Sequence, residues 1–358
     1  MMSPREVHQF ELDNQVIGTD ADRVYVVAEL SANHGGSIEN TMALIAAAKE
    51  AGASAVKLQT YTPDTITLNC ERDEFFIRNG PWAGRTLYDL YSEGCLPWHW
   101  HEPLFEFARD IGVTLFSSPF DETAIDLLEK CNCPAYKIAS FELVDHGLIA
   151  RAASTGKPLI MSTGMAFLEE IDEAVTVAQK EGAKDIVLLK CVSGYPAEPK
   201  SFDLNGLQIL KEMFGLPVGL SDHTLSNTVA IASVALGAVF VEKHFTLDRS
   251  TGGLDSKFSI TPQELKSLVT ELGLARDATQ GSSFGPKDDE VTSLNYRRSL
   301  YFVRHISKGD KITTRDLKSV RPSNGLPPKY FTEVVGATAT SDIPANTPVS
   351  WALITKCI

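Results

Sequence analysis

Two histidines, His223 and His244, each follow a short apolar run in the second half of the chain. The runs 217–220 and 239–241 predict buried parallel strands, and the segment 227–236 between them is long enough for a helix. Such a strand–helix–strand unit would bring both imidazoles to the carboxyl ends of neighbouring strands, ~5 Å apart in the hydrogen-bonding direction. Because imidazole nitrogens are common ligands of divalent metals, the pair predicts a shared metal ion. The alternative is that each histidine is only a hydrogen-bonded residue of the scaffold.

The elements that must position this pair alternate between short apolar strands and helical segments. The expected strands cover residues 24–29, 55–59, 113–117, 135–138, 158–162, 186–191, 217–220 and 239–241. The expected helices include 37–51, 227–236 and 261–279, and a long insertion rich in aromatic residues covers 61–98. Eight such units in ~250 residues predict a TIM-type (β/α)8 barrel, whose active site lies at the carboxyl ends of the strands.

Polar side chains are frequent at the ends of these expected strands. They are Glu29, Lys57, Gln59, Ser118, Lys137, Ser140, Glu142, Ser162, Ser193, Tyr195, Ser221 and Glu242. Two lysines with several hydroxyl groups would form a cradle for phosphate and carboxylate groups. The alternative for each single lysine is a side chain that only extends toward solvent.

The C-terminal part of the chain has a different pattern. We expect the barrel to cover residues 1–280, a linker rich in Gly, Ser and charged residues to cover 281–295, and a small domain of short strands and hairpins to cover 296–358. Within the small domain, residues 306–312 and 343–349 form a weak internal repeat.

Composition limits the possible partners and the compartment. The formal net charge of −13 argues against nucleic acid and anionic membranes as partners. Residues 1–23 show no apolar signal-peptide core, and no apolar run is long enough to span a membrane. The six cysteines have neither metal-site nor disulfide spacing, so we expect free thiols and a cytoplasmic location.

Six ordered motifs resemble those of the sialic acid synthase family. They are AELSANH at 28–34, VKLQT at 56–60, YKIAS at 136–140, STGM at 162–165, SDHT at 221–224 and EKHFT at 242–246. The resemblance implies a transferase that condenses phosphoenolpyruvate with an acylated amino sugar, giving a nine-carbon 2-keto acid and phosphate with C–O bond cleavage. It also implies a divalent metal, Mn²⁺ before Mg²⁺ or Co²⁺.

The C-terminal part resembles the antifreeze-like (SAF, β-clip) domain of the same family. In that family the domain lies over the barrel of the partner chain in a domain-swapped homodimer. The resemblance then implies that Arg321 reaches the sugar site of the neighbour. The alternative is a surface cation that packs its stem against Pro322.

Further motifs resemble the branch of the family that makes pseudaminic acid. They are KLQTYTPDT at 57–65, LYDLY at 87–91, LPW at 96–98, ASFE at 139–142 and GGLDS at 252–256. The implied sugar is a 2,4-diacetamido-2,4,6-trideoxy hexose of the altrose type. Phe141 stands where the neuraminate branch typically has glycine, and its ring would narrow the pocket beside a sugar methyl group, unless it packs into the barrel wall. The alternative activity is N-acetylneuraminate or legionaminate synthesis from an N-acetylmannosamine-type sugar.

The reaction suggests a role for each group. His223 and His244 are the expected metal ligands, and Glu29, Glu242 and Asp255 are the expected catalytic carboxylates, with the acid and the base left unassigned. The expected contacts to phosphate and carboxylate are Lys57, Lys137, Ser140, Ser162 and Ser221. Two other classes, a metal-dependent hydrolase and a noncatalytic carbohydrate-binding protein, remain as alternatives.

Overall fold

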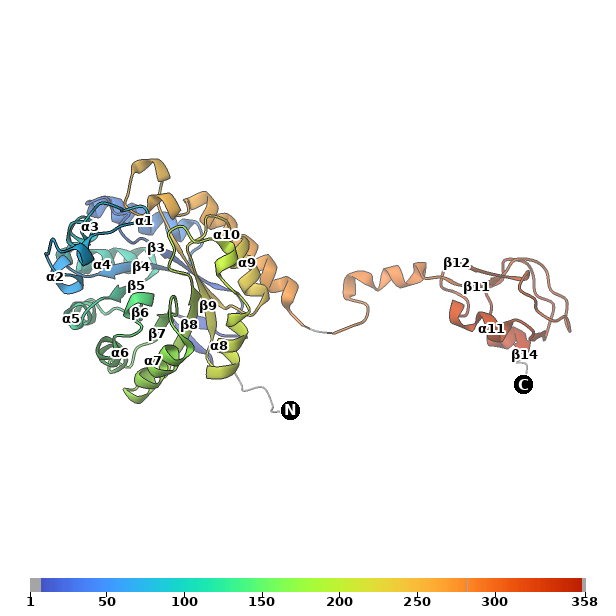
Figure 1. Cartoon of the computed structure of the whole chain (residues 1–358). Helices are drawn as coiled ribbons and strands as arrows, with labels where there is room; N and C mark the ends of the chain where they lie inside the picture. Colours follow the sequence, from blue (N-terminus) through green and yellow to red (C-terminus); the bar gives the residue numbers. More distant parts are fainter. Residues whose placement is uncertain (1–7, 282, 356–358) are drawn as a thin grey trace. The chain divides into compact units, whose positions relative to one another are not determined.

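The computed structural model describes residues 8–281 and 283–355 (Figure 1). The chain divides into two compact units, Met1–Gln280 and Gly281–Ile358, and each is described here by itself. Two predictions fall partly outside the described residues. They concern residues 1–7 of the N-terminal segment, which was expected to lack a signal peptide, and Cys357, which was expected to be a free thiol.

The first unit is a closed barrel of parallel strands in the order β10-β3-β4-β5-β6-β7-β8-β9. The strands are β3 (Tyr25–Glu29), β4 (Ala55–Thr60), β5 (Thr114–Pro119), β6 (Tyr136–Ile138), β7 (Leu159–Ser162), β8 (Ile186–Cys191), β9 (Val218–Asp222) and β10 (Phe240–His244). This architecture confirms the predicted TIM-type barrel. β9 and β10 are longer than predicted because their ladder continues through the polar pairs Glu242–Ser221 and Lys243–Asp222.

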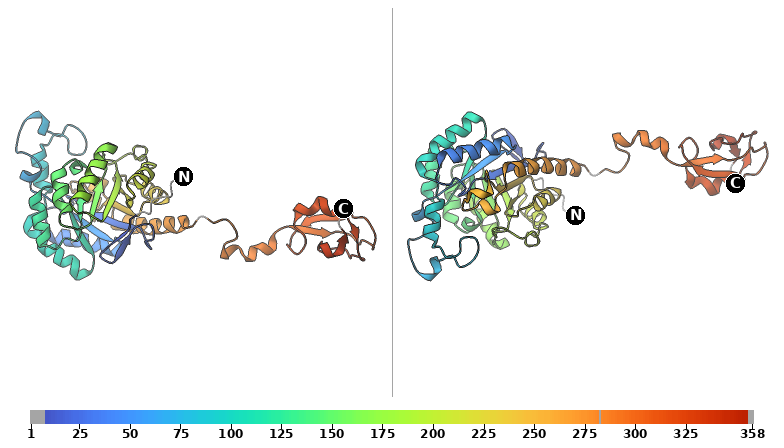
Figure 2. Two further views of the ribbon diagram at one scale, coloured as in Figure 1. Left: turned by 90° about the horizontal axis from the view of Figure 1, so that it is seen from below. Right: turned by 90° about the horizontal axis from the view of Figure 1, so that it is seen from above.

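Helices surround these strands (Figure 2). They are α1 (Ile38–Glu50), α2 (Pro63–Ile66), α3 (Leu87–Gly94), α4 (His101–Ile111), α5 (Glu122–Lys130), α6 (His146–Ala153), α7 (Leu168–Lys180), α8 (Gly206–Phe214), α9 (Thr228–Ala235) and α10 (Pro262–Thr279). Local chemistry sets the ends: the Ser37 hydroxyl accepts from the Asn40 amide at the start of α1, and Gly112 ends α4 with a φ of 70° that favours glycine. The long insertion contains α2 and α3. None of the helices in the described ranges is long and apolar enough to cross a membrane.

An N-terminal hairpin precedes the barrel and was missed by the sequence analysis. Strands β1 (Phe10–Leu12) and β2 (Gln15–Ile17) pair in antiparallel fashion. Asp13 and Asn14 form the two-residue turn between them, with φ of 46° and 64°. Phe10, Leu12 and Ile17 are buried and belong to the core of the barrel.

The second unit has its own small core. It pairs β11 (Ser299–Phe302) with β12 (Leu317–Val320) and β13 (Thr338–Ala339) with β14 (Ile354–Thr355), and it adds the short helix α11 (Phe331–Val334). The two halves of the weak repeat pair with each other through a bridge between Ile306 and Ile343. Both side chains are buried in a cluster separate from the core of the barrel.

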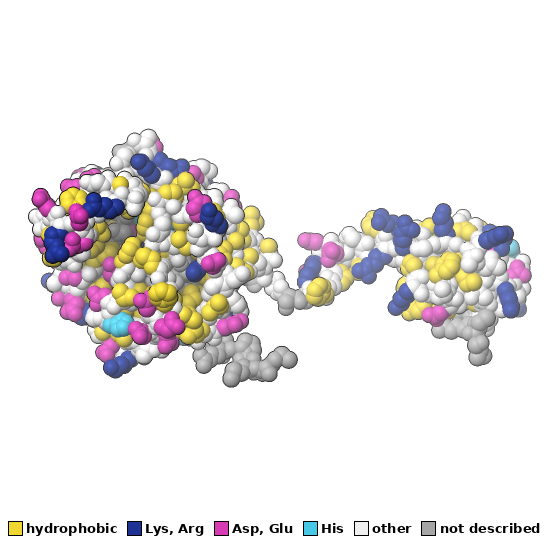
Figure 3. Space-filling model, in the orientation of Figure 1, with side chains coloured by type: hydrophobic (Ala, Val, Ile, Leu, Met, Phe, Trp, Pro, Cys, Tyr) yellow, Lys and Arg dark blue, Asp and Glu magenta, His cyan; other side chains and the backbone are white. Residues whose placement is uncertain are grey.

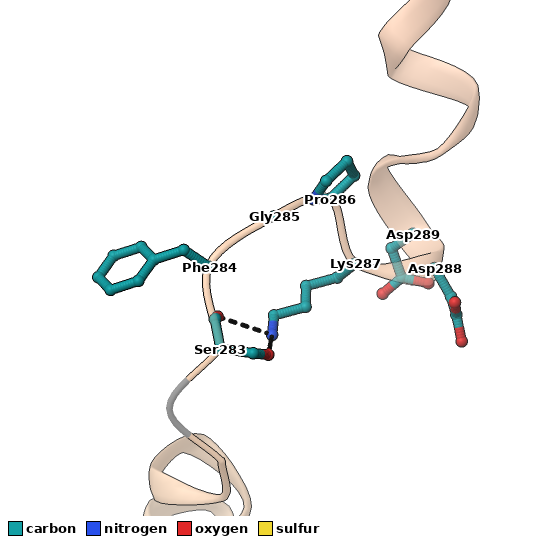
Figure 4. Close-up of a pocket in the computed structure, with 7 residues that line it drawn as sticks. All are labelled: Ser283, Phe284, Gly285, Pro286, Lys287, Asp288 and Asp289. Carbon is teal, nitrogen blue, oxygen red and sulfur yellow. Dashed lines mark hydrogen bonds between the residues drawn. The ribbon is translucent and has the colours of Figure 1, made fainter.

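The segment expected to be a linker contains two short 3₁₀ helices, Asp288–Glu290 and Thr292–Tyr296. Before them the Lys287 ammonium donates to the carbonyl and hydroxyl of Ser283, at 3.1 and 2.7 Å, while Phe284 points away from this contact (Figure 4). Residues 283–289 line a small pocket, and no predicted site residue is among these consecutive residues.

Candidate active site

The ends of β3, β4, β5 and β10 meet around the ammonium group of Lys57. Its Nζ lies 2.5 Å from Oε2 of Glu29 and 3.5 Å from Oε1 of Glu242, and it donates to the Ser118 hydroxyl at 3.1 Å. Gln59 donates to the other oxygen of Glu29 at 3.1 Å. Four strands therefore contribute to one hydrogen-bonded group at the mouth of the barrel.

A second buried lysine shares Glu242 with the first. Lys137 Nζ donates to the Ser162 hydroxyl at 2.6 Å and lies 3.9 Å from Oε1 of Glu242. Lys57 is 3% exposed and Lys137 is 2% exposed. The alternative of lysines that only extend toward solvent is therefore wrong, and the barrel holds two ammonium groups ready for an anion.

Burial and the two lysines separate the pKa values of Glu29 and Glu242. Burial raises the pKa of Glu29 to about 7, although Lys57 opposes this effect. Burial would also raise the pKa of Glu242, but the charges of Lys137 and Lys57 outweigh burial and hold it below its ordinary value. Burial lowers the pKa of Lys137, whereas Glu242 and Glu29 outweigh burial and raise that of Lys57. Two carboxylates with separated pKa values can take different roles in proton transfer.

The hydroxyl groups of Ser140, after β6, and Ser193, after β8, meet at Gly164, which follows β7. The Gly164 amide donates to the Ser140 hydroxyl at 3.1 Å, and the Ser193 hydroxyl is buried without a partner among the described residues. A Cβ atom at position 164 would lie 2.5 Å from Ser193 Oγ and 2.7 Å from Ser140 Oγ. Oε2 of Glu142 is also buried without a described partner, and burial raises the pKa of this residue to about 7. Unpartnered buried polar atoms favour a site that binds a ligand.

Ser221 lies between neighbouring strands on the same inner surface. It is buried and pairs in register with Cys191 on β8 and with Glu242 on β10. The structure therefore brings it to the predicted site.

The two histidines lie next to each other, with ring centroids 5.2 Å apart. His223 Nδ1 lies 2.8 Å from the Val192 carbonyl and must donate to it, so in the neutral ring the lone pair is on Nε2. Burial opposes a proton on His223, but a hydrogen bond with the Cys191 thiol raises its pKa. Burial, reinforced by His223 and Lys57, lowers the pKa of His244 well below its ordinary value, and its Nδ1 is buried without a described partner.

These two rings fit a divalent ion held by two protein nitrogens. Within residues 8–281 and 283–355, no group of three or more His, Cys, Asp or Glu side chains is placed to hold a metal. The other positions around such an ion would be left for water and substrate.

An aromatic wall stands beside the histidines. The Tyr195 ring lies 4.4 Å from that of His223, and the Phe258 ring lies 5.0 Å from that of His244. Trp82 adds a third ring, 5.7 Å from Tyr195, and donates its indole N–H to the Leu254 carbonyl. Sequence reasoning missed Trp82 and Phe258, although the aromatic-rich insertion around Trp82 was a usable signal.

Asp255 lies in the loop after β10, at the edge of this wall. It accepts a hydrogen bond from the Ser31 hydroxyl and a weaker one from the Ala32 amide at 3.4 Å. Burial raises its pKa, and the hydrogen bond from Ser31 opposes this effect. The structure joins it to the β3 loop rather than to either lysine.

Two other predicted residues are not part of the buried cluster. Phe141 is 60% exposed, so the alternative that it packs into the barrel wall is wrong. Arg321 lies in the second unit with an exposed side chain, and its contact with the sugar of a neighbouring chain stays a prediction.

The barrel and this cluster define the chain as a (β/α)8 enzyme for small anionic molecules. Residues 44–283 match the model of the NeuB family, and residues 297–355 match that of the SAF domain. The chain therefore belongs to the NeuB family.

Individual relatives agree with this assignment. A pseudaminic acid synthase of Campylobacter jejuni is 42% identical over 90% of this chain and 94% of its own length. An N,N'-diacetyllegionaminic acid synthase of Legionella pneumophila is 36% identical over 91% of this chain and 93% of its own length. The crystal structure of an N-acetylneuraminic acid synthetase from Leptospira borgpetersenii, in complex with citrate, has a TM-score of 0.72 and 29% identity over 80% of this chain and 95% of that one.

Proposed function

We propose that this enzyme condenses phosphoenolpyruvate with 2,4-diacetamido-2,4,6-trideoxy-altrose and water to give pseudaminic acid and phosphate. The observation that carries the proposal is the pair of buried lysines joined through Glu242 and surrounded by hydroxyl groups. Phosphoenolpyruvate has two anionic groups on a three-carbon frame, and two fixed ammonium groups can bind both. The choice of sugar is supported by the higher identity to the pseudaminic acid synthase, 42%, than to the N,N'-diacetyllegionaminic acid synthase, 36%.

The reaction makes one carbon–carbon bond and breaks one carbon–oxygen bond. Carbon 3 of phosphoenolpyruvate attacks the sugar aldehyde, water adds to the resulting cationic carbon 2, and the adduct expels phosphate to leave the 2-keto acid. Lys57 and Lys137, with the hydroxyls of Ser140, Ser162 and Ser221, hold phosphate and carboxylate through these changes of charge.

The carboxylates divide the proton transfers between them. Glu29, with a pKa of about 7, can hold or release a proton near neutral pH, so we assign it to proton transfer at the aldehyde oxygen or the attacking water. Glu242, kept ionised by both lysines, orients them. Asp255 is the candidate for a sugar hydroxyl or for a second base.

His223 and His244 would hold a divalent ion, with Mn²⁺ the first choice and Mg²⁺ or Co²⁺ the alternatives. When bound, the ion supplies positive charge for the sugar aldehyde. The neutral state of His244 supports this role.

A domain-swapped homodimer completes the proposal. Residues 297–355 contain nine Lys and Arg but four Asp and Glu, whereas the whole chain has a net charge of −13. Lys and Arg side chains are prominent on the second unit (Figure 3). A basic second unit would be attracted to the acidic barrel of another chain, where Arg321 could approach the sugar site. The use of phosphoenolpyruvate and the free thiols of the described cysteines support a cytoplasmic location.

The test is phosphate release that requires both substrates, with mass analysis of the nine-carbon product. The proposal expects no phosphate from phosphoenolpyruvate alone, and it expects His223→Ala and His244→Ala to fold without activity. Phosphate release without the sugar would favour the hydrolase. Sugar binding without phosphate release under any metal condition would favour the binding protein.

A further inference from the structure

A buried ion pair lies directly behind the two histidines. Lys243 precedes His244 on β10, and Asp222 precedes His223 at the end of β9. The two residues are opposite each other in the parallel ladder, with Lys243 Nζ 2.7 Å from Asp222 Oδ2 and both side chains 0% exposed. Because side chains alternate along a strand, this pair faces the helices while His244 faces the barrel mouth.

The same ion pair also holds the backbone of the turn that follows His223. The second carboxylate oxygen of Asp222 accepts from the Thr224 amide at 2.8 Å. The Lys243 ammonium also donates to the carbonyls of Thr224 and Ser226, at 2.5 and 3.3 Å. β9 ends at Asp222, so no strand pairing fixes the backbone from His223 onward. The hydrogen bonds to Lys243 and Asp222 fix this turn instead.

Stability alone is a weak reason for such a pair. Burying two charges has a large desolvation cost, and apolar side chains of similar volume often stabilise a fold equally well. Apolar side chains could not, however, make the hydrogen bonds that this pair makes to the Thr224 amide and to the carbonyls of Thr224 and Ser226. The geometry is that of a clamp between the turn after β9 and the end of β10.

We propose that Lys243 and Asp222 are positioning residues that hold His223 and His244 at the separation needed to share a metal ion. The inference rests on the proposed metal site and assigns no contact between the pair and the ion. In known metal sites, changing a residue that orients a ligand typically weakens metal binding 10- to 100-fold.

The experiment measures Mn²⁺ binding by the electron paramagnetic resonance signal of the free ion, together with Tm, for the full-length enzyme. The variants are Lys243→Met, Asp222→Asn and the double variant Asp222→Leu/Lys243→Met, which leaves no unpaired buried charge. The control is Lys157→Met, which breaks the pair of Lys157 and Glu129 (2.5 Å). Lys157 lies before the start of β7, at the opposite end of the strands from the histidines.

We expect the Kd for Mn²⁺ to rise about 10- to 100-fold in the three variants and to stay at the wild-type value in Lys157→Met. A folded double variant with the wild-type Kd would overturn the positioning role, even if its Tm were lower. The outcome that refutes the metal site itself is different: the wild type would bind no Mn²⁺, or His223→Ala and His244→Ala would bind it as well as the wild type does.

Discussion

Replacing Gly164 by alanine should weaken the use of phosphoenolpyruvate while leaving the barrel folded. The added Cβ would lie 2.5 Å from Ser193 Oγ, 2.7 Å from Ser140 Oγ and 3.1 Å from Ser140 Cβ. A Cβ atom essentially never lies within 3.0 Å of another heavy atom, so both hydroxyl groups must turn away from their present positions. Hydrogen bonds to charged groups contribute about 1.5–3 kcal/mol each. Losing one of them predicts a fall in kcat/KM for phosphoenolpyruvate of roughly 10- to 100-fold.

The assay is phosphate release at varied phosphoenolpyruvate and fixed sugar, with direct binding of phosphoenolpyruvate measured by calorimetry. The control is Gly273→Ala in α10, where an added Cβ meets no atom within 4 Å. This control should keep full activity and gain up to about 1 kcal/mol of stability from helix propensity. If Gly164→Ala folds and binds phosphoenolpyruvate as tightly as the wild type, the Ser140 hydroxyl does not contribute to binding phosphoenolpyruvate.

Three further predictions concern substrate choice, assembly and pH. The wild type should prefer 2,4-diacetamido-2,4,6-trideoxy-altrose over N-acetylmannosamine roughly ten- to hundred-fold in kcat/KM, and Phe141→Gly should narrow this gap; an unchanged gap removes Phe141 from specificity. A chain ending at Glu290 should keep the circular dichroism of a folded barrel but lose phosphate release, and full activity would show that the second unit is dispensable. Because burial raises the pKa of Glu142 to about 7, this group favours folding most at low pH and loses that contribution as pH rises through 7. In urea unfolding, the free energy of unfolding of Glu142→Gln should therefore rise by about 2 kcal/mol relative to that of the wild type between about pH 5.5 and 8. A difference that stays constant over this range would contradict the raised pKa of Glu142.

The sequence predicted the barrel because each buried parallel strand is a short, almost continuous apolar run. The hairpin of β1 and β2 was missed because its strands are three residues long and its buried residues Phe10, Leu12 and Ile17 are separated by polar ones. Its one local signal was the Asp13-Asn14 pair, because Asp and Asn tolerate the positive φ that such a turn requires.

The site was predictable as far as it depends on strand ends. Lys57, Lys137 and Glu242 come from separate strands, and barrel closure alone brings them together. Trp82 was not predictable in this way, since its position depends on the path of a long loop held by a hydrogen bond to Leu254. The bond between Lys243 and Asp222 depends on the exact ladder register, which strand periodicity does not define.

The distribution of burial across the site predicts an order of substrate binding. Lys57, Lys137 and Ser162 are 3%, 2% and 1% exposed. In the aromatic wall Phe258 is also buried, but its outer rings, Tyr195 and Trp82, are only partly buried. A sugar against that wall would therefore lie outside phosphoenolpyruvate and block its entry. Phosphoenolpyruvate should bind first, and its carboxylate and phosphate should complete the floor on which the sugar rests. Calorimetry should show phosphoenolpyruvate binding to the free enzyme and sugar binding only in the presence of an unreactive phosphoenolpyruvate analogue; equal sugar affinity with and without that analogue would contradict the order.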